Sequence, residues 1–479
     1  MSTTSIKKAA IINFAGKYTN IFIQLIYNAI LARILTPEDF GIVAVVTVFT
    51  NFFMLFANMG IGPAIIHDKE FDENDNNNIF TFTIYIGLII AVLFSIFSAI
   101  FIASFYGNDI YIPIGILLSV SLFFNTLNIV PNALLLKEHR FKLVSMRMVI
   151  VAIVTAIPTI FLAFMGLKYY AIVFHSILVS MVTFLWNYRT VRPKFQRKIT
   201  LDSYRRIRSY SSYQMGFSFI NYFSRNIDNL LIGRFIDSKA LGFYDKSYKL
   251  MLYPVNNLTH VITPVLHPIL SKEQDNKRYV YHQYVKVVKI LSLLGIFITA
   301  YSYFAGEEII RFFYGNQWDA SIPSFKILSL SIFFQMTVSS AGAIYQTLGN
   351  TRNMFKSSII FTSITITCIV IGVALGDINS VALFVLISLI IKFFIDYYFL
   401  INKSFGLSVI SFYKIFIPDL IIFAFMFMGM SLASLITIEN TLLSLIYKMV
   451  VCVVIYIAGI YLTKQDGYIK MLIQPKKTK

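Results

Sequence analysis

Long apolar runs dominate the chain, and each is long enough to cross about 30 Å of hydrocarbon as an α-helix. Fourteen such runs lie at approximately 9–34, 40–64, 79–104, 111–135, 147–166, 168–188, 210–236, 243–268, 286–306, 322–347, 356–375, 380–401, 415–437 and 441–463. Hydrophobic residues make up 57% of the 479 residues and charged residues only 13%, whereas about a quarter of the residues in soluble domains are charged. The sequence therefore predicts an all-α polytopic membrane protein with about 14 transmembrane helices and excludes a single soluble domain.

The formal net charge of +18 comes from 41 Lys and Arg residues against 23 Asp and Glu residues. In a soluble protein this excess would suggest nucleic-acid binding, but membrane proteins keep basic residues on their cytoplasmic loops. With both termini placed in the cytoplasm, most Lys and Arg residues fall on inward segments, and the outward loops 107–110 and 376–379 contain none. We therefore expect a multi-pass protein of the cell membrane, with cytoplasmic termini and no nucleic-acid partner.

The two halves of the chain repeat each other at an offset of 201 residues. Identical residues at this offset pair Asn20 with Asn221, Phe22 with Phe223, Asn28 with Asn229, Arg33 with Arg234, Gly41 with Gly242 and Pro63 with Pro264. An even number of predicted spans separates the copies, so both enter the membrane in the same direction and are related by an axis along its normal. The repeat predicts two parallel-repeat six-helix bundles around a central cavity, followed by two additional helices.

The longest hydrophilic stretch runs from Arg189 to Arg208 and is strongly basic. Such a stretch is typical of a cytoplasmic linker whose cations face anionic membrane lipids. We therefore predict four segments: an N-terminal bundle at 1–190, a linker at 191–209, a second bundle at 210–402, and two helices with a basic cytoplasmic tail at 403–479.

Polar side chains form a stripe along the first predicted span, and an equivalent stripe recurs on the seventh. At about 100° per residue, the first stripe comprises Asn13, Lys17, Asn20, Gln24 and Tyr27 or Asn28, and the second comprises Gln214, Ser218, Asn221, Arg225 and Asp228. Polar groups that face lipid are costly, so both stripes should face the protein interior or water. For each Asn and Gln, the alternative is a hydrogen bond that merely joins two helices.

Lys17 and Arg225 stand out because helix packing within a membrane seldom requires a cation. They indicate an aqueous cavity that receives an anionic ligand. The predicted substrate-binding residues are Lys17, Asn20, Gln24, Asn28, Gln214, Ser218, Asn221, Arg225 and Asp228. Asp228 is interpreted either as a partner that holds the Arg225 guanidinium or as a titrating group in coupling to a proton or sodium gradient.

The remaining charged residues of the spans suggest structural roles. Lys392 and Asp396 have the i, i+4 spacing of a mutually neutralised pair, whereas Lys448 stands alone in the last span and could contact a lipid headgroup. The sequence contains no phosphate-binding loop, catalytic-triad motif or HExxH motif, and His175, His260 and His267 lack metal-ligand spacing. We therefore predict no enzyme, no metal site and no cofactor.

Several motifs resemble those of Wzx-type polysaccharide flippases, particularly the colanic-acid exporter branch of the multidrug/oligosaccharidyl-lipid/polysaccharide exporter superfamily. These motifs are NYFSRNIDNLLIGRF at 221–235, ALGFY at 240–244, LMLYP at 250–254, LARIL at 31–35 and MGIGPAII at 59–66. The resemblance implies translocation of undecaprenyl-pyrophosphate-linked oligosaccharide repeat units from the inner to the outer leaflet for surface polysaccharide synthesis. It also implies polysaccharide polymerase and chain-length machinery as partners.

Two other functions fit the same predicted fold. A peptidoglycan-precursor lipid flippase would share the two additional helices and the cationic cavity. A multidrug exporter would favour an acidic cavity for cationic drugs, whereas the two stripes contain Lys17 and Arg225 against Asp228. One departure from the resembled family is Asn58, which stands where the family often carries an acidic residue, so a coupling role at that position is not expected.

Overall fold

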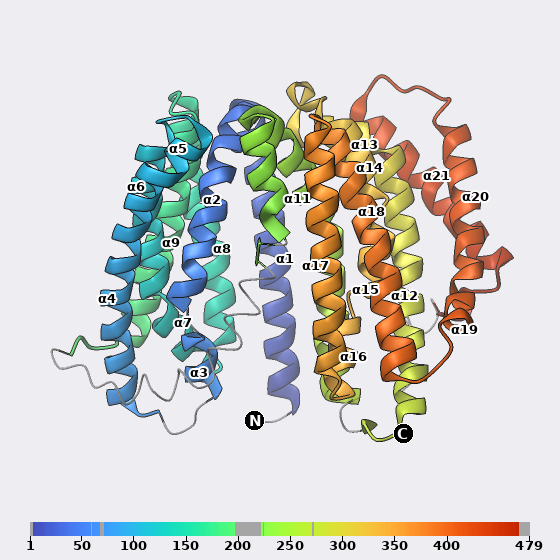
Figure 1. Ribbon diagram of the computed structural model, residues 1–479, viewed down its shortest axis with the longest axis horizontal. Helices are drawn as coiled ribbons and strands as arrows, with labels where there is room; N and C mark the ends of the chain where they lie inside the picture. Colours follow the sequence, from blue (N-terminus) through green and yellow to red (C-terminus); the bar gives the residue numbers. More distant parts are fainter. Residues whose placement is uncertain are drawn as a thin grey trace. The chain divides into compact units, whose positions relative to one another are not determined.

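The computed structural model describes residues 3–58, 60–67, 71–196, 222–223, 225–270 and 273–468, and the side chains of all of these except 3–14, 67 and 260–269. The described residues are almost entirely helical, which confirms the predicted all-α membrane class (Figure 1). Ten described helices are long and apolar enough to cross a membrane, or eleven if the bent pair Ser321–Ser329 and Ile332–Thr347 forms one span. The total of 14 spans stays a prediction.

Contacts divide the chain into two compact units, Met1–Gly242 and Phe243–Lys479. The first unit contains α1 (Thr3–Ile34), α2 (Pro37–Asn58), α3 (Ile61–His67), α4 (Glu73–Phe97), the π-helix η1 (Ser98–Ile102), α5 (Ala103–Tyr106), α6 (Tyr111–Leu127), α7 (Ile129–Lys137), α8 (Phe141–Phe164) and α9 (Tyr169–Val191). Within this unit α8 packs against both α1 and α9, and α6 packs against α2, α4 and α9.

The second unit contains most of α11 (Ser238–Leu270), followed by α12 (Lys277–Phe304), α13 (Gly306–Tyr314), η3 (Asn316–Trp318), α14 (Ser321–Ser329), α15 (Ile332–Val338), α16 (Ala341–Thr347), α17 (Thr351–Ala374), α18 (Ile378–Tyr397), η4 (Tyr398–Ser404), α19 (Val409–Tyr413), η5 (Lys414–Phe416), α20 (Ile417–Ala433) and α21 (Thr441–Leu462). The last two long helices, drawn in red in Figure 1, pack against each other and against α12. Their attachment to α12 places them within this unit.

The division between the units falls after the predicted linker, because residues 222–242 contact the first repeat. The Tyr222 hydroxyl donates to the Val48 carbonyl oxygen, and the Tyr106 hydroxyl donates to the Leu230 carbonyl oxygen at 3.0 Å. The ring centroids of Phe52 and Phe223 lie 4.9 Å apart. The division after Gly242 does not test the predicted segment boundaries at 190, 209 and 402, which stay predictions.

Two repeat-related glycines make the same contact in reciprocal positions. A Cβ atom at Gly41 would lie 1.7 Å from the Ser238 carbonyl oxygen, and one at Gly242 would lie 1.8 Å from the Pro37 carbonyl oxygen. Pro37 and Ser238 are themselves 201 residues apart. The first turns of α2 and α11 thus meet backbone to backbone, which only glycine permits at this separation, and the repeat offset is reproduced in space.

Helix α8 has two opposite faces that suit it to a membrane protein. Ile157, Phe161 and Phe164 are largely exposed on one face, as expected for side chains that contact lipid. Ser145 and Thr155 are buried on the other face. A Cβ atom at Gly16 of α1 would lie 2.6 Å from the Ser145 Cβ atom, so small residues allow α1 and α8 to approach closely.

Candidate substrate-binding pocket in the first unit

A polar pocket of about 190 Å³ lies between α1, α8 and α9 within the first unit. Its lining residues are Asn20, Ile23, Gln24 and Tyr27 of α1, Arg147, Met148, Val151 and Ala152 of α8, and His175, Val179 and Thr183 of α9. The α9 members follow a spacing of four residues, so they share one face of that helix. Apolar walls with a few polar groups are the usual composition of a site for a small ligand.

Arg147 is the cation of this pocket and is only 6% exposed. Its Nη1 atom donates hydrogen bonds to the Asn132 Oδ1 atom at 3.2 Å and to the Asn187 Oδ1 atom at 2.5 Å. The Asn187 amide nitrogen in turn donates to the Asn128 Oδ1 atom at 2.7 Å. Across the part of the chain that the structure describes, no carboxylate lies within ion-pair distance of Arg147. The guanidinium is therefore solvated by amides but not neutralised.

His175 and Tyr27 form an aromatic wall of the same pocket. Their rings stack with centroids 4.3 Å apart and an interplanar angle of 25°. The Thr159 hydroxyl donates to the Thr155 carbonyl oxygen at 2.8 Å, and its oxygen lies 3.1 Å from the His175 Nδ1 atom, within hydrogen-bond distance. His175 is therefore held within the helix packing, as expected for an interior histidine.

Two of the predicted site residues, Asn20 and Gln24, line the pocket. Lys17 lies one turn earlier on α1, is partly exposed and does not line it. The Asn28 side-chain amide donates to the Gln24 carbonyl oxygen at 2.8 Å, a bond within its own helix. The structure thus brings part of the first predicted stripe to the pocket.

The second stripe is only partly described. Gln214, Ser218 and Asn221 lie outside the described residues. The Arg225 side chain is exposed, whereas Asp228 is buried and its Oδ1 atom accepts the Asn229 backbone N–H at 2.9 Å. The two roles of Asp228, as a partner of the Arg225 guanidinium and as a titrating group, remain predictions.

Arg147 is the residue that sequence reasoning missed. The predicted fifth span begins at Arg147, which places this residue at the membrane boundary, but α8 begins at Phe141 and carries Arg147 into its buried face. The series His175, Val179, Thr183 and Asn187 could have revealed it, because three of these four residues are polar and all lie on one face of a predicted span.

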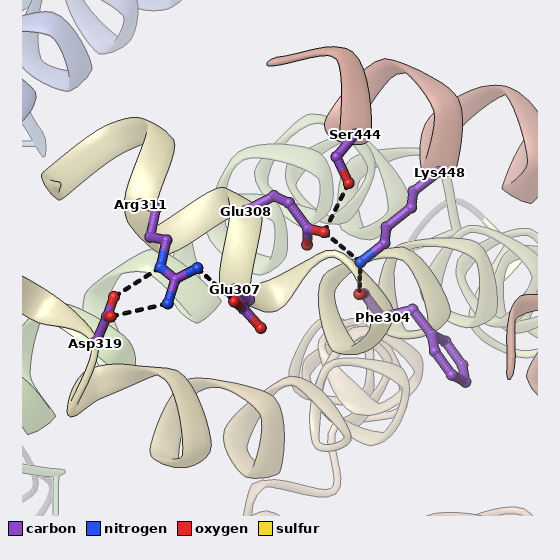
Figure 2. A network of polar contacts seen from close by, with 7 residues as sticks. All are labelled: Phe304, Glu307, Glu308, Arg311, Asp319, Ser444 and Lys448. Atoms are coloured by element: carbon purple, nitrogen blue, oxygen red, sulfur yellow. Dashed lines mark hydrogen bonds and ion pairs between the residues drawn. The ribbon is translucent and has the colours of Figure 1, made fainter. Parts of the chain in front are cut away.

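Lys448 has a partner, so the prediction that it stands alone is wrong. Its Nζ atom binds the Glu308 carboxylate and donates to the Phe304 carbonyl oxygen at 2.9 Å, and the Ser444 hydroxyl donates to the same carboxylate at 2.8 Å (Figure 2). The partner is 140 residues away in the sequence. An ion pair across α13 and α21 replaces the suggested contact with a lipid headgroup.

Other cations of the second unit are also paired. Lys289 of α12 donates to the Asp419 Oδ1 atom of α20 at 2.5 Å, and the Ser292 hydroxyl donates to the other oxygen of that carboxylate at 2.5 Å. Lys392 and Asp396 form the predicted i, i+4 pair at 3.3 Å, which confirms that prediction. The Lys289–Asp419 pair joins two helices, whereas the Lys392–Asp396 pair lies within one helix. In each pair the carboxylate neutralises the charge of the lysine.

Long apolar helices around a pocket with polar and cationic side chains define a multi-pass membrane protein. The fold matches that of the lipid II flippase MurJ in an inward closed conformation, with a TM-score of 0.76, 17% sequence identity and coverage of 97% of this chain and 100% of that one. A family model described as "Polysaccharide biosynthesis protein" matches residues 30–323. The chain belongs to this family of polysaccharide biosynthesis proteins.

Two relatives with curated descriptions agree with this membership. The lipopolysaccharide biosynthesis protein WzxC of Escherichia coli (strain K12) is 23% identical over 403 residues, which cover 81% of this chain and 79% of WzxC. The teichuronic acid biosynthesis protein TuaB of Bacillus subtilis (strain 168) is 22% identical over 337 residues, which cover 69% of this chain and 70% of TuaB. The resemblance to Wzx-type proteins is confirmed.

Proposed function

We propose that the chain is a flippase that moves undecaprenyl-pyrophosphate-linked oligosaccharide repeat units from the inner to the outer leaflet for surface polysaccharide synthesis. The protein would work by alternating access, in which the polar head group is exposed first to one side of the membrane and then to the other. Lys17 and Arg225 would neutralise the pyrophosphate, and the amides of Asn20, Gln24 and Asn28 would bind sugar hydroxyls. Gln214, Ser218, Asn221 and Asp228 would serve the same ligand from the second repeat.

The observation that carries this proposal is a polar pocket with a cation among helices that are otherwise apolar. A pyrophosphate and its sugars cannot enter hydrocarbon unaided, because every unpaired polar group there is costly. The polyprenyl tail has no such cost and can stay in the lipid. Amides and a guanidinium within the membrane offer the head group the hydrogen bonds that lipid lacks.

The proposed location is the inner or plasma membrane with both termini in the cytoplasm. The positive charge of the inward segments supports this orientation. Polysaccharide polymerase and chain-length machinery are the expected partners on the outer side, and a proton or sodium gradient is the expected source of energy. Reporter fusions at each end of the chain test the orientation.

The main rival is a peptidoglycan-precursor flippase, which the fold of MurJ suggests. The names of WzxC and TuaB favour surface polysaccharides instead. Deletion separates the two functions, since loss of a nonredundant peptidoglycan flippase kills the cell, whereas loss of a surface polysaccharide does not. A multidrug exporter is disfavoured by the guanidinium in the pocket, which would repel cationic drugs.

The test is complementation of a deletion strain. Lys17→Glu and Arg225→Glu each reverse a cation of the predicted stripes, and we expect loss of surface polysaccharide with normal amounts of protein in the membrane. Arg140→Glu is the matched control, because Arg140 is half-exposed, pairs with Glu138 and does not line the pocket. Normal polysaccharide in both reversal variants would contradict the proposed roles of these residues.

A further inference from the structure

We propose that the pocket between α1, α8 and α9 is an oxyanion subsite, in which Arg147 binds a phosphate or carboxylate group of the transported head group. This inference deepens the proposed function and rests on it for the natural source of the anion. It adds a site inside the first unit, separate from Lys17 and Arg225.

The first step is the charge of the pocket. A guanidinium stays protonated at every accessible pH, so Arg147 cannot avoid its buried charge by losing a proton. Buried charges in proteins are normally paired, yet within the described ranges Arg147 is hydrogen-bonded only to the amide oxygens of Asn132 and Asn187. An anion that enters the pocket supplies the missing opposite charge.

The second step is the geometry of the guanidinium. Both of its hydrogen bonds start from Nη1, so in the described part of the chain Nε and Nη2 have no acceptor. These two nitrogens form the edge of the guanidinium that binds an oxyanion through two parallel hydrogen bonds. Asn128 holds Asn187, which holds Nη1. The guanidinium is therefore fixed in place before a ligand arrives.

The third step is the room around Arg147. The pocket has a volume of about 190 Å³, whereas a single water needs only about 10–15 Å³ of such space. The side chains of Asn20 and Gln24 on α1 provide neutral donors and acceptors. The stacked rings of Tyr27 and His175 provide a flat apolar surface. This combination suits an oxyanion that is attached to a sugar better than it suits a free halide ion.

The same chemistry has two sources in a lipid-linked oligosaccharide. One is the pyrophosphate that joins the sugar to the polyprenol, and the other is an acidic sugar such as a uronic acid. Both present two oxygens to a guanidinium. Inorganic pyrophosphate and glucuronate can stand in for them, and glucose serves as a neutral probe of similar size to glucuronate.

The experiment is a binding titration on the purified full-length protein in lipid nanodiscs, in which the thermal unfolding midpoint reports binding. A ligand that binds the folded state raises this midpoint in a saturable way. We expect pyrophosphate, glucuronate or both to raise it and glucose not to. Arg147→Gln should weaken the affinity at least about tenfold. Arg140→Gln, directly before the same helix, half-exposed and outside the pocket, should change it less than about twofold.

Each arm of the titration has a defined meaning. A response to pyrophosphate alone assigns the subsite to the carrier phosphates, and a response to glucuronate alone assigns it to an acidic sugar. No saturable response to either probe in the unaltered protein, or equal affinities for Arg147→Gln and the unaltered protein, would overturn the subsite.

Two further variants cover failure to fold. Gln24→Leu alters the exposed α1 side of the pocket but leaves the amides that hold Arg147 unchanged. It should lower the affinity for the probe several-fold. Arg147→Lys keeps the charge and should retain part of the affinity. The outcome is also separable from the proposed function: loss of polysaccharide in the deletion strain without any probe binding would leave the flippase assignment standing and remove the subsite.

Discussion

Two buried lysines of the second unit and one buried arginine of the first unit have different kinds of partner. In the second unit Lys289 contacts the Asp419 carboxylate and Lys448 contacts the Glu308 carboxylate. In the first unit Arg147 is as deeply buried, but its hydrogen-bond partners in the described chain are the amides of Asn132 and Asn187.

The difference separates two reasons for placing a charge within a membrane. A cation that pairs with a carboxylate on another helix joins the two helices, and its charge is neutralised without a ligand. A buried cation that contacts only amides lacks an opposite charge, and an anionic ligand can supply that charge. From this contrast we infer a structural role for Lys289 and Lys448 and a binding role for Arg147, and the substitutions below can break or sharpen it.

The largest effect is expected at the Lys289–Asp419 pair, whose carboxylate is fully buried. Lys289→Met leaves Asp419 without its cation and should lower the free energy of unfolding by roughly 3–5 kcal/mol, since an uncompensated buried charge remains. The double variant Lys289→Met/Asp419→Leu should recover most of this loss. Unfolding of the purified protein in mixed micelles measures both, and an additive double variant would show that the pair is not coupled.

The Glu308–Lys448 pair should follow with a smaller loss of about 1–3 kcal/mol for Lys448→Met, because both groups keep some exposure. Burial acts to raise the pKa of Glu308, but hydrogen bonds from Lys448 and Ser444 outweigh it, and the pKa is lowered. A lowered carboxylate pKa gives stability that is present above the unfolded pKa of about 4.3 and is lost as the pH falls through the folded value.

The pH dependence of unfolding checks this second prediction. The difference in thermal unfolding midpoint between the unaltered protein and Glu308→Gln should shrink as the pH falls below about 4. A difference that stays constant down to pH 3 would show that the carboxylate does not contribute through its charge.

Unlike Lys289→Met, Arg147→Gln should not lower the free energy of unfolding. Removing a buried charge that has no carboxylate partner should leave the free energy of unfolding unchanged or raise it by up to about 1 kcal/mol, while transport is lost. The same unfolding experiment and the surface polysaccharide assay provide the two readouts. A loss of several kcal/mol would assign Arg147 to structure and remove the contrast between the units.

The smallest effect is expected for Lys392→Gln. Lys392 pairs with Asp396 across one helical turn at 3.3 Å, and its side chain is about one-third exposed. Exposed and half-exposed pairs of this kind contribute about 0–1 kcal/mol. A midpoint within a few degrees of the unaltered protein is expected, and a loss comparable to that of Lys289→Met would show that burial does not rank these pairs.

The sequence was informative where the physics is local. Apolar runs place helices well, as in α1 around the predicted span 9–34 and α11 around 243–268. The offset of 201 residues, inferred from isolated identical residues in the two halves, also relates the reciprocal contacts of Gly41 and Gly242. The i, i+4 spacing was sufficient for Lys392 and Asp396, because both members lie on one helix.

Long-range partners could not be predicted in this way. Lys448 and Glu308 meet only when α13 and α21 pack together, and no spacing rule links residues 140 positions apart. Arg147 stands at the start of the predicted span 147–166, where a positive charge normally marks the membrane boundary. The amides that solvate it come from α7 and α9, so its burial depends on how the helices pack, and the polar series on the predicted span 168–188 is a sequence signal for it.

The most direct test of the central claim is transport itself. Purified protein in vesicles that contain undecaprenyl-pyrophosphate-linked oligosaccharide should expose the sugar at the opposite leaflet much faster than protein-free vesicles, as measured by access of a membrane-impermeant glycosidase. We predict that Arg147→Gln falls to the protein-free rate, whereas Lys289→Met/Asp419→Leu and Arg140→Gln keep most of the rate. Transport by Arg147→Gln at the unaltered rate would contradict the account.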